Sequence, residues 1–238
     1  NGTFTEQAVP RGLAYNALGG TASNMGIAVG DVDNDGLFDV FVPHLAEENH
    51  ALWLQGPVGV FQDKTAAAGL IGTGWHGTGF APVLADFDND GALDLAVANG
   101  AVNLAKGLRT PARPAANVPA FWAPYAHSHQ LFANDGSGHF REISAANPAM
   151  CSEATVARGL VCGDLDNDGA PDLLISSIGS PAKVYRNVAP ARGHWLGVRA
   201  IDPALGGRDA YGAEVFVQAG TRRFWRLGQR EKLETIAA

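Results

Sequence analysis

Cysteine and long apolar runs are scarce in this sequence, and each shortage removes a class of protein. Two of the 238 residues are cysteine, Cys151 and Cys162, so the chain is not a small scaffold held together by disulfides. The two thiols either form a single bridge or stay apart, with Cys162 as a small core residue. No apolar run reaches the roughly 20 residues that a membrane-spanning helix needs, so we expect no membrane span.

Positive charge is also in short supply. The chain has 17 Lys and Arg residues against 24 Asp and Glu residues, which gives a formal net charge of −7. Proteins bind nucleic acids through clustered Lys and Arg, so this balance argues against a nucleic-acid partner. The one dense basic stretch lies within residues 222–232, and a solvated strand face accounts for it.

Glycine, proline and hydrophobic residues are plentiful, and they recur in a repeated order. The chain contains 30 glycines and 13 prolines, and 46% of its residues are hydrophobic. This composition favours many short strands joined by tight turns over long helices. Three segments align, each with an acidic loop between two strand-like stretches, and each follows an upstream Gly-x-Phe phrase. The aligned segments are Gly26–Val42, Phe80–Val97 and Arg158–Ile175, and the phrases begin at Gly2, Gly59 and Gly138.

The repeat unit reads as strand, connection, strand, acidic loop, strand, turn and strand. Four strands per unit are typical of a β-propeller blade, so we expect an all-β fold of four-stranded antiparallel blades. The units span about residues 1–55, 56–135 and 136–187, and a small β-rich domain follows over 188–238. A proline-rich insertion at Ala101–Tyr125 reads as a surface loop. Three blades are fewer than the roughly four to eight of a closed propeller, so the propeller is incomplete.

Each acidic loop follows the pattern D-x-D-N-D-G-x-x-D. Four carboxylates within one short loop repel one another unless a cation lies between them. Calcium binds six to eight hard oxygen ligands, which this array can supply. The predicted ligands are Asp31, Asp33, Asp35 and Asp39 in the first loop, Asp86, Asp88, Asp90 and Asp94 in the second, and Asp164, Asp166, Asp168 and Asp172 in the third.

The glycine at position six of each loop allows a sharp turn that aims the next carbonyl inward. Those carbonyls belong to Leu37, Ala92 and Ala170, which complete the predicted ligand sets. Position twelve is Val42, Val97 or Ile175, so the loops lack the bidentate Glu of an EF-hand. Acidic Asx-turns without metal are the alternative. Three copies at one phase of a repeat favour calcium, about one ion per loop.

Extracellular calcium modules bind with dissociation constants of about 10⁻⁴–10⁻³ M. Such sites fill where calcium is millimolar, so we expect an extracellular or cell-surface location.

With these loops, glycines and Gly-x-Phe phrases, residues 1–187 resemble the FG-GAP/VCBS repeat family, which includes integrin α-subunit heads and many exported bacterial proteins. The resemblance implies a β-propeller with calcium held by the twelve aspartates between strands. Gly193–Arg199 and Gly207–Val215 are similar to the ASPIC/UnbV domain that follows FG-GAP repeats in cartilage-acidic-protein-like proteins. The end of the chain departs from that pattern, because Leu227–Leu233 stands where the family has a Gly/Ser-Tyr-Ser-Gln stretch.

The pattern favours a non-catalytic structural or adhesive module whose partners are other protein chains or copies of itself, docked head to tail. The alternative is a carbohydrate-active enzyme or a carbohydrate-binding module, with glycans as partners. Catalytic motifs such as G-x-S-x-G, H-E-x-x-H and a P-loop do not occur, so we expect no enzyme. The residues that the alternative would draw on are His76, His127, His129, Trp53, Trp75, Trp122, Trp195 and Trp225.

Overall fold

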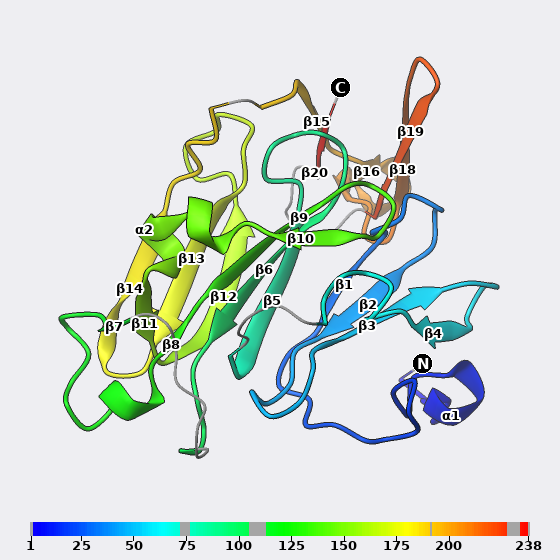
Figure 1. Cartoon of the computed structure of the whole chain (residues 1–238). Coiled ribbons are helices and arrows are strands. Elements are labelled where there is room, and N and C mark those ends of the chain that lie inside the picture. The colour runs from blue at the N-terminus through cyan, green and yellow to red at the C-terminus, as the bar shows by residue number, and fades with distance from the viewer. Residues whose placement is uncertain (1, 72–76, 105–112, 191, 228–233, 238) are drawn as a thin grey trace.

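The fold is described from a computed structural model that covers residues 2–71, 77–104, 113–190, 192–227 and 234–237. Three antiparallel sheets stand side by side, and a fourth group of strands lies at one end of them (Figure 1). The helical elements are single turns, and no helix in the described residues is long and apolar enough to cross a membrane. These turns are α1 (Ala8–Arg11), η1 (Ala123–Tyr125), η2 (Ser144–Ala146), α2 (Pro148–Cys151) and η3 (Pro203–Leu205).

The first sheet is a four-stranded meander, and the second sheet has the same number of strands in the order β10-β9-β6-β5. The third sheet has the order β12-β13-β14. The expected all-β fold of antiparallel blades is confirmed, and the described strands form an incomplete propeller. The bounds are β1 (Ala28–Gly30), β2 (Asp39–Val42), β3 (Ala51–Gln55), β4 (Phe61–Asp63), β5 (Gly79–Ala85), β6 (Asp94–Asn99), β9 (Gln130–Asn134), β10 (Phe140–Glu142), β12 (Ala157–Gly163), β13 (Asp172–Ser177) and β14 (Ser180–Tyr185).

The Gly-x-Phe strands pair differently from the order that the repeat unit suggested. Phe61 in β4 pairs with Gln55, so this strand completes the first sheet instead of opening the second. Phe140 in β10 likewise pairs with Asn134 at the outer side of the second sheet. A short hairpin joins each strand to its predecessor, and neighbouring strands in sequence usually pair. The sheets are therefore offset from the sequence units by one strand.

Apolar rows hold neighbouring sheets together. Phe41 and Leu52 of the first sheet pack against Leu95 and Val97 of the second, and all four are buried. A second cluster joins the second and third sheets, with Ala96 and Leu131 on one side and Leu160, Leu173 and Ile175 on the other. Cys151 and Cys162 pack in or against this second cluster without a disulfide between them. Each fully buried Leu or Phe side chain stabilises the stack by about 1.5–3 kcal/mol.

The insertion between β6 and β9 is more ordered than a surface loop. Within its described part, β7 (Arg113–Pro114) and β8 (His127–Ser128) flank β11 (Glu153–Thr155) in a small sheet of their own. The prolines are tolerated because β7 is a two-residue edge strand. Trp122 and Tyr125 pack against a buried alanine and valine cluster, whereas Phe121 is 72% exposed.

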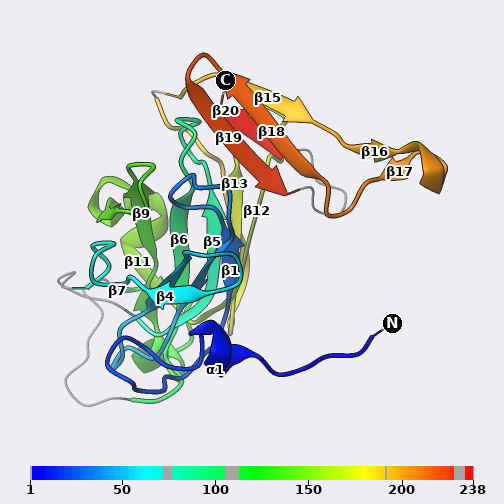
Figure 2. The ribbon, with the colours of Figure 1, turned by 90° about the vertical axis from the view of Figure 1, so that its right-hand side faces the viewer.

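The C-terminal segment, residues 192–237 in its described parts, lies across one end of the three sheets (Figure 2). Its strands pair as hairpins or as β15 with β20. Trp225 packs edge-on against Phe38 of the first acidic loop, with ring centroids 4.7 Å apart. The strands are β15 (Trp195–Val198), β16 (Ile201–Asp202), β17 (Arg208–Asp209), β18 (Glu214–Ala219), β19 (Arg222–Leu227) and β20 (Glu234–Ala237).

Candidate metal centres

The three acidic loops join β1 to β2, β5 to β6 and β12 to β13, so they occupy equivalent places in their sheets. In each loop, three carboxylates bring oxygen atoms within 4.8 Å of one another. The structure does not gather all four aspartates equally, because the position-five aspartate falls outside the group in the first and third loops and the position-nine aspartate in the second. The groups are Asp31, Asp33 and Asp39, then Asp86, Asp88 and Asp90, then Asp164, Asp166 and Asp172.

The first aspartate of each loop organises the turn. Asp31 accepts hydrogen bonds from the backbone N–H groups of Asp35 and Gly36 at 3.1 and 3.0 Å. Asp86 and Asp164 accept the equivalent bonds in their own loops at 2.9–3.0 Å. Because these bonds are local, the nine-residue pattern alone specifies the loop shape.

Two residues of each loop adopt the left-handed backbone region. The expected glycine at position six has φ between 86° and 97° in the three loops. The asparagine at position four also has positive φ, between 56° and 60°. Asparagine tolerates this region better than most residues with a side chain, so the Asn-Asp-Gly sequence itself indicates a turn with positive φ at both positions. The residues are Asn34, Asn89 and Asn167, with Gly36, Gly91 and Gly169.

The last aspartate of each loop fastens it to the third strand of the sheet. Asp39 accepts one hydrogen bond from Val32 N and another from Gln55 N, both at 2.9 Å. Asp94 and Asp172 repeat this arrangement at 2.7–3.1 Å. A carboxylate oxygen has two lone pairs, so these bonds leave capacity for a cation. The position-seven residues Leu37 and Ala92 donate their N–H groups to Asp35 and Asp90, both at 2.8 Å.

Burial makes the carboxylates of the first two loops costly to ionise. It raises the pKa of Asp31 and Asp86 to about 6 and the pKa of Asp39 and Asp94 to about 7, while backbone hydrogen bonds oppose the rise. Charges of neighbouring aspartates add to it. Crowded, buried oxygen donors with raised pKa values suit a hard divalent cation, because the cation compensates both desolvation and repulsion. The donor set therefore fits calcium, and each ligand role stays a prediction.

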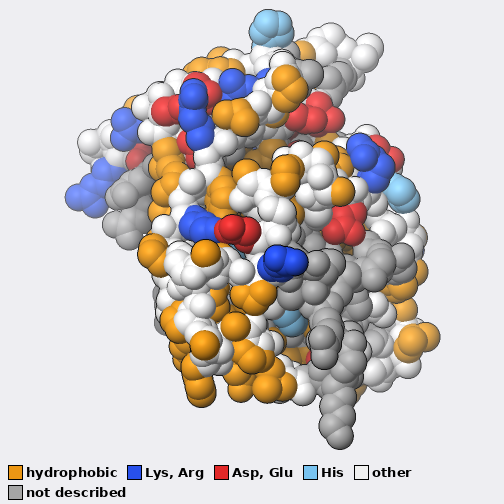
Figure 3. All heavy atoms as spheres, turned by 60° about the vertical axis from the view of Figure 1, so that its left-hand side comes forward, with side chains coloured by type: hydrophobic (Ala, Val, Ile, Leu, Met, Phe, Trp, Pro, Cys, Tyr) orange, Lys and Arg blue, Asp and Glu red, His pale blue; other side chains and the backbone are white. Residues whose placement is uncertain are grey.

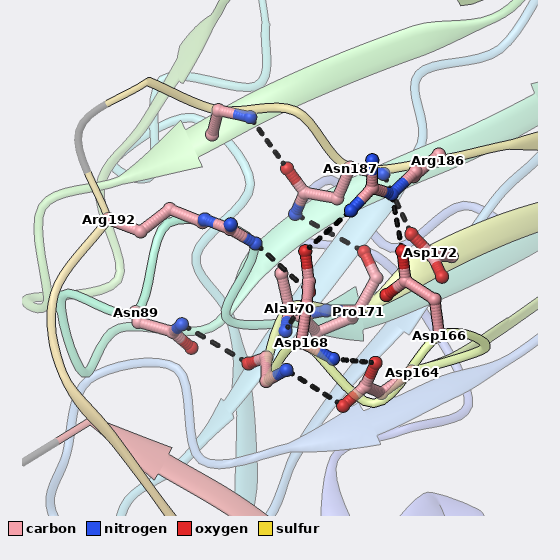
Figure 4. Close-up of polar contacts among 12 residues, drawn as sticks. Asn89, Asp164, Asp166, Asp168, Ala170, Pro171, Asp172, Arg186, Asn187 and Arg192 are labelled. Carbon is pink, nitrogen blue, oxygen red and sulfur yellow. Dashed lines mark hydrogen bonds and ion pairs between the residues drawn. The ribbon is translucent and has the colours of Figure 1, made fainter.

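The third loop differs, because arginines contact its carboxylates (Figure 4). Arg186 donates to Asp166 and also to Asp168, the latter at 3.3 Å. Arg192 donates to the other oxygen of Asp168 at 3.1 Å. A hydrogen bond from Ala170 N, together with these arginines, lowers the pKa of Asp168. The second loop also has an arginine nearby, since the charge of Arg226 opposes the rise in the pKa of Asp86.

Amide side chains connect successive loops, which the sequence analysis missed. Asn134 Nδ2 donates to the carbonyl of Leu93 in its own loop at 3.0 Å and to that of Val32 in the preceding loop at 2.8 Å. Asn187 Nδ2 makes the equivalent pair of bonds to Pro171 and Phe87. We call Asn134 and Asn187 the bridging amides. The sequence has an amide residue at this position in all three repeats, Gln55 in the first, and this recurrence could have indicated a shared role.

The two histidines of the H-x-H motif serve the fold. His127 Nδ1 accepts from Thr78 N at 3.1 Å, and His129 Nδ1 accepts from Asn99 N at 3.2 Å. Burial lowers both pKa values to about 4, so the rings are neutral at physiological pH. Among the described residues, neither histidine belongs to a potential metal-binding group. Trp75 and His76 lie outside the described residues.

A cavity of about 800 Å³ lies between the N-terminal segment, residues 13–24, and the first sheet. Trp53 lines it, and its indole Nε1 is buried without a hydrogen-bond partner. The side chains of Glu47, Glu48 and Asp63 also line the cavity, so its polar rim is largely acidic. Tyr15 adds a second aromatic ring that is half exposed.

Comparison with protein families supports part of this picture. A family model described as FG-GAP-like repeat matches residues 120–175, from the insertion through the third acidic loop into β13. The chain thus contains an FG-GAP-like repeat, which is typical of repeat scaffolds of the adhesion type. A comparison with curated proteins finds no match. The resemblance of residues 188–238 to the ASPIC/UnbV domain, and the division into repeats that the sequence suggested, stay predictions.

Proposed function

We propose that this chain is a calcium-stabilised structural or adhesive module that works outside the cytoplasm and has no catalytic activity. The observation that carries the proposal is the recurrence of one loop geometry, in which carboxylate oxygens approach within 4.8 Å at three equivalent places. Raised pKa values at the buried aspartates of the first two loops give the physical reason for a cation. Calcium would supply positive charge and six to eight coordination bonds there.

Thermal unfolding with calcium or with chelator tests this proposal. With dissociation constants near 10⁻⁴ M, millimolar calcium adds about 1.4 kcal/mol for each filled site. Two filled loops would then raise the melting temperature by about 6–12 °C. The double variant Asp33→Asn/Asp88→Asn should lose most of this gain, whereas Glu47→Gln, an exposed acidic residue outside the loops, should keep it. A melting temperature that is the same with calcium and with chelator would overturn the proposal.

Self-assembly is the second part of the proposal, and it rests on one row of side chains. Val83, Ala96 and Leu131 pair across the second sheet and are covered by the third. The equivalent row in the third sheet is Val161, Leu174 and Val184, which also pair across their strands.

That row is open to solvent, with Val161 58% and Val184 59% exposed. Hydrophobic side chains are numerous on the face that Figure 3 brings forward. In the other two sheets the same row is covered by a neighbouring sheet. The exposed row of the third sheet is therefore a surface on which a further blade can pack. We infer that a second copy of this chain supplies that blade, in a head-to-tail contact.

Sedimentation velocity in calcium measures the association directly. We expect concentration-dependent oligomers that Val161→Lys abolishes, because a buried lysine would be unpaired in the contact. Leu205→Lys is the matched control, since Leu205 has the same 58% exposure as Val161 and lies in η3 of the C-terminal segment. A monomer at high concentration, or equal association of both variants, would refute the head-to-tail contact and leave the calcium proposal standing.

Saccharide binding is the alternative function, and the 800 Å³ cavity favours it. Tyr15, which is half exposed, offers an aromatic face to a sugar ring at this cavity. The acidic rim disfavours anionic glycans, so the ligand class is neutral oligosaccharides. Titration calorimetry with cellohexaose and chitohexaose should show binding that weakens in Tyr15→Ala, with melting curves confirming the fold. Absence of heat with both sugars would refute this alternative.

A further inference from the structure

The three acidic loops share a backbone but differ in the residue at the end of the third strand of each sheet, one position before the amide. The residue before the amide position is Leu54 in the first repeat, Ala133 in the second and Arg186 in the third. Two of these side chains carry no charge, so a guanidinium reaches the carboxylates from this position in the third loop alone. A sequence difference at one strand position therefore separates the third loop from the other two.

Arg186 and Arg192 contact the carboxylates at positions three and five of the third loop. Arg186 spans Asp166 and Asp168, and Arg192 takes the second oxygen of Asp168 at 3.1 Å (Figure 4). Both oxygens of Asp168 are thus engaged by arginine. The two guanidinium groups carry the same total charge as one calcium ion, so they compensate these carboxylates without metal.

Arg192 belongs to the connection that leads into the C-terminal segment, and that connection is held between two loops. Gly193 N donates to the carbonyl of Asp88 in the second loop at 2.8 Å. A Cβ atom at Gly193 would lie 2.0 Å from the carbonyl oxygen of Asn89, so the backbones are in close contact. Trp195 lies directly on Gly169 of the third loop, where an added Cβ would overlap its indole ring. Arg192 and Trp195 thus attach the start of the C-terminal segment to the third loop, and Gly193 attaches it to the second.

Calcium and these arginines compete for the carboxylates of Asp166 and Asp168, which are predicted ligands of the third loop. A calcium ion coordinates oxygen at 2.3–2.6 Å and repels a guanidinium held within hydrogen-bond distance of the same carboxylate.

We propose that Arg186 and Arg192 form an arginine latch on the third loop, which calcium must displace, so that filling this loop releases the start of the C-terminal segment. The inference rests on the proposed calcium function of the loops. It makes the third loop the weakest of the three sites, because displacement of two arginines from surface ion pairs weakens calcium binding about three- to thirtyfold. It also links calcium concentration to the attachment of residues 192–198.

Calorimetric titration of the chelator-treated protein with calcium chloride measures the sites. The wild type should bind two ions and then a third about three- to thirtyfold more weakly. The double variant Arg186→Gln/Arg192→Gln should bind three ions with similar affinity. Arg141→Gln, which removes an exposed arginine of β10, is the matched control and should behave like the wild type.

Hydrogen exchange at residues 192–198 gives a second measurement. Protection in calcium-free wild type should fall when calcium fills the third site, and it should already be low in the calcium-free double variant. Three equal sites in both proteins, or unchanged protection in the double variant, would overturn the latch but not the calcium function. Absence of calcium binding at every loop would overturn both, which separates the two failures.

Discussion

Asn134→Ala removes one side chain at the junction of the first two sheets. Asn134 is buried, and its Nδ2 donates to the carbonyls of Val32 and Leu93 at 2.8 and 3.0 Å. Its Oδ1 accepts from Gly136 N at 3.1 Å. The substitution leaves two buried carbonyls and one N–H group without these partners, at the place where two loops meet.

The expected loss of stability follows from those three bonds. A buried polar group without a partner costs about 1–3 kcal/mol. Water can reach Gly136 more easily than the two carbonyls, so we count the carbonyls and expect a loss of about 2–4 kcal/mol. This is a large fraction of the 5–15 kcal/mol that typically stabilises a folded protein. With a urea slope near 3 kcal/mol per molar, the midpoint should fall by about 1 M.

Equilibrium unfolding in urea, followed by tryptophan fluorescence and circular dichroism, measures this loss. Gln55→Ala is the internal control. Gln55 holds the same position in the first sheet, but its Nε2 donates at 2.9 Å to Phe38 within its own loop and connects no two loops. We expect it to cost less than half as much as Asn134→Ala. If the two variants unfold at the same urea concentration, or Asn134→Ala stays within about 0.5 kcal/mol of wild type, the bridge between loops is not a stabilising contact.

Three further outcomes follow from the structure. Calcium-free protein should become more stable as pH falls from 8 towards 5. Asp39 and Asp94 have a pKa of about 7 in the folded chain, so they bind protons there, whereas aspartates of the unfolded chain, with a pKa near 3.9, do not. The gain in stability from calcium should shrink over the same pH range, and a melting temperature of calcium-free protein that rises with pH would contradict this. Leu95→Ala should cost about 2–5 kcal/mol in urea unfolding, since Leu95 is fully buried between two sheets, and a cost below 1 kcal/mol would mean that the sheets do not pack as described. Gly100→Ala should cost about 1–3 kcal/mol, because an added Cβ would lie 2.7 Å from Ala157 N. Gly163→Ala is the control, because its Cβ meets no atom within 4 Å and the variant should be tolerated. Equal melting temperatures for both variants would argue against the close approach at Gly100.

The parts of this fold that sequence could predict are those specified by local patterns. The loops are an example, because Asp31 forms its turn with residues four and five positions ahead. Position-six glycine and alternating apolar residues likewise act over short distances. The bridging amides could not be derived this way, because Asn134 reaches a carbonyl in the preceding repeat. The pairing of Phe61 with the earlier sheet depends on a choice between two neighbours that alternation leaves undecided.

The arginine contacts show a different limit. Arg186 and Arg192 are ordinary surface residues by composition, and only the folded strand and connection bring them to Asp168. The C-terminal segment was equally hard to read, since its strands have no second copy in the chain for comparison. The fold of the first 187 residues could be predicted because their sequence pattern repeats, and the C-terminal segment has no such repeat.

The bridging amides all reach backwards, from the third strand of one repeat to the loop of the repeat before it. A chain made from its N-terminus completes each junction when the later repeat is synthesised, and Asn34 and Asn89 then also donate forward, to Gly136 and Gly169. The first loop is finished before its partner amide emerges from the ribosome, and each new sheet docks on a surface that already exists. Each junction is therefore closed by the repeat that is translated last, and the sheets can assemble in the order of translation.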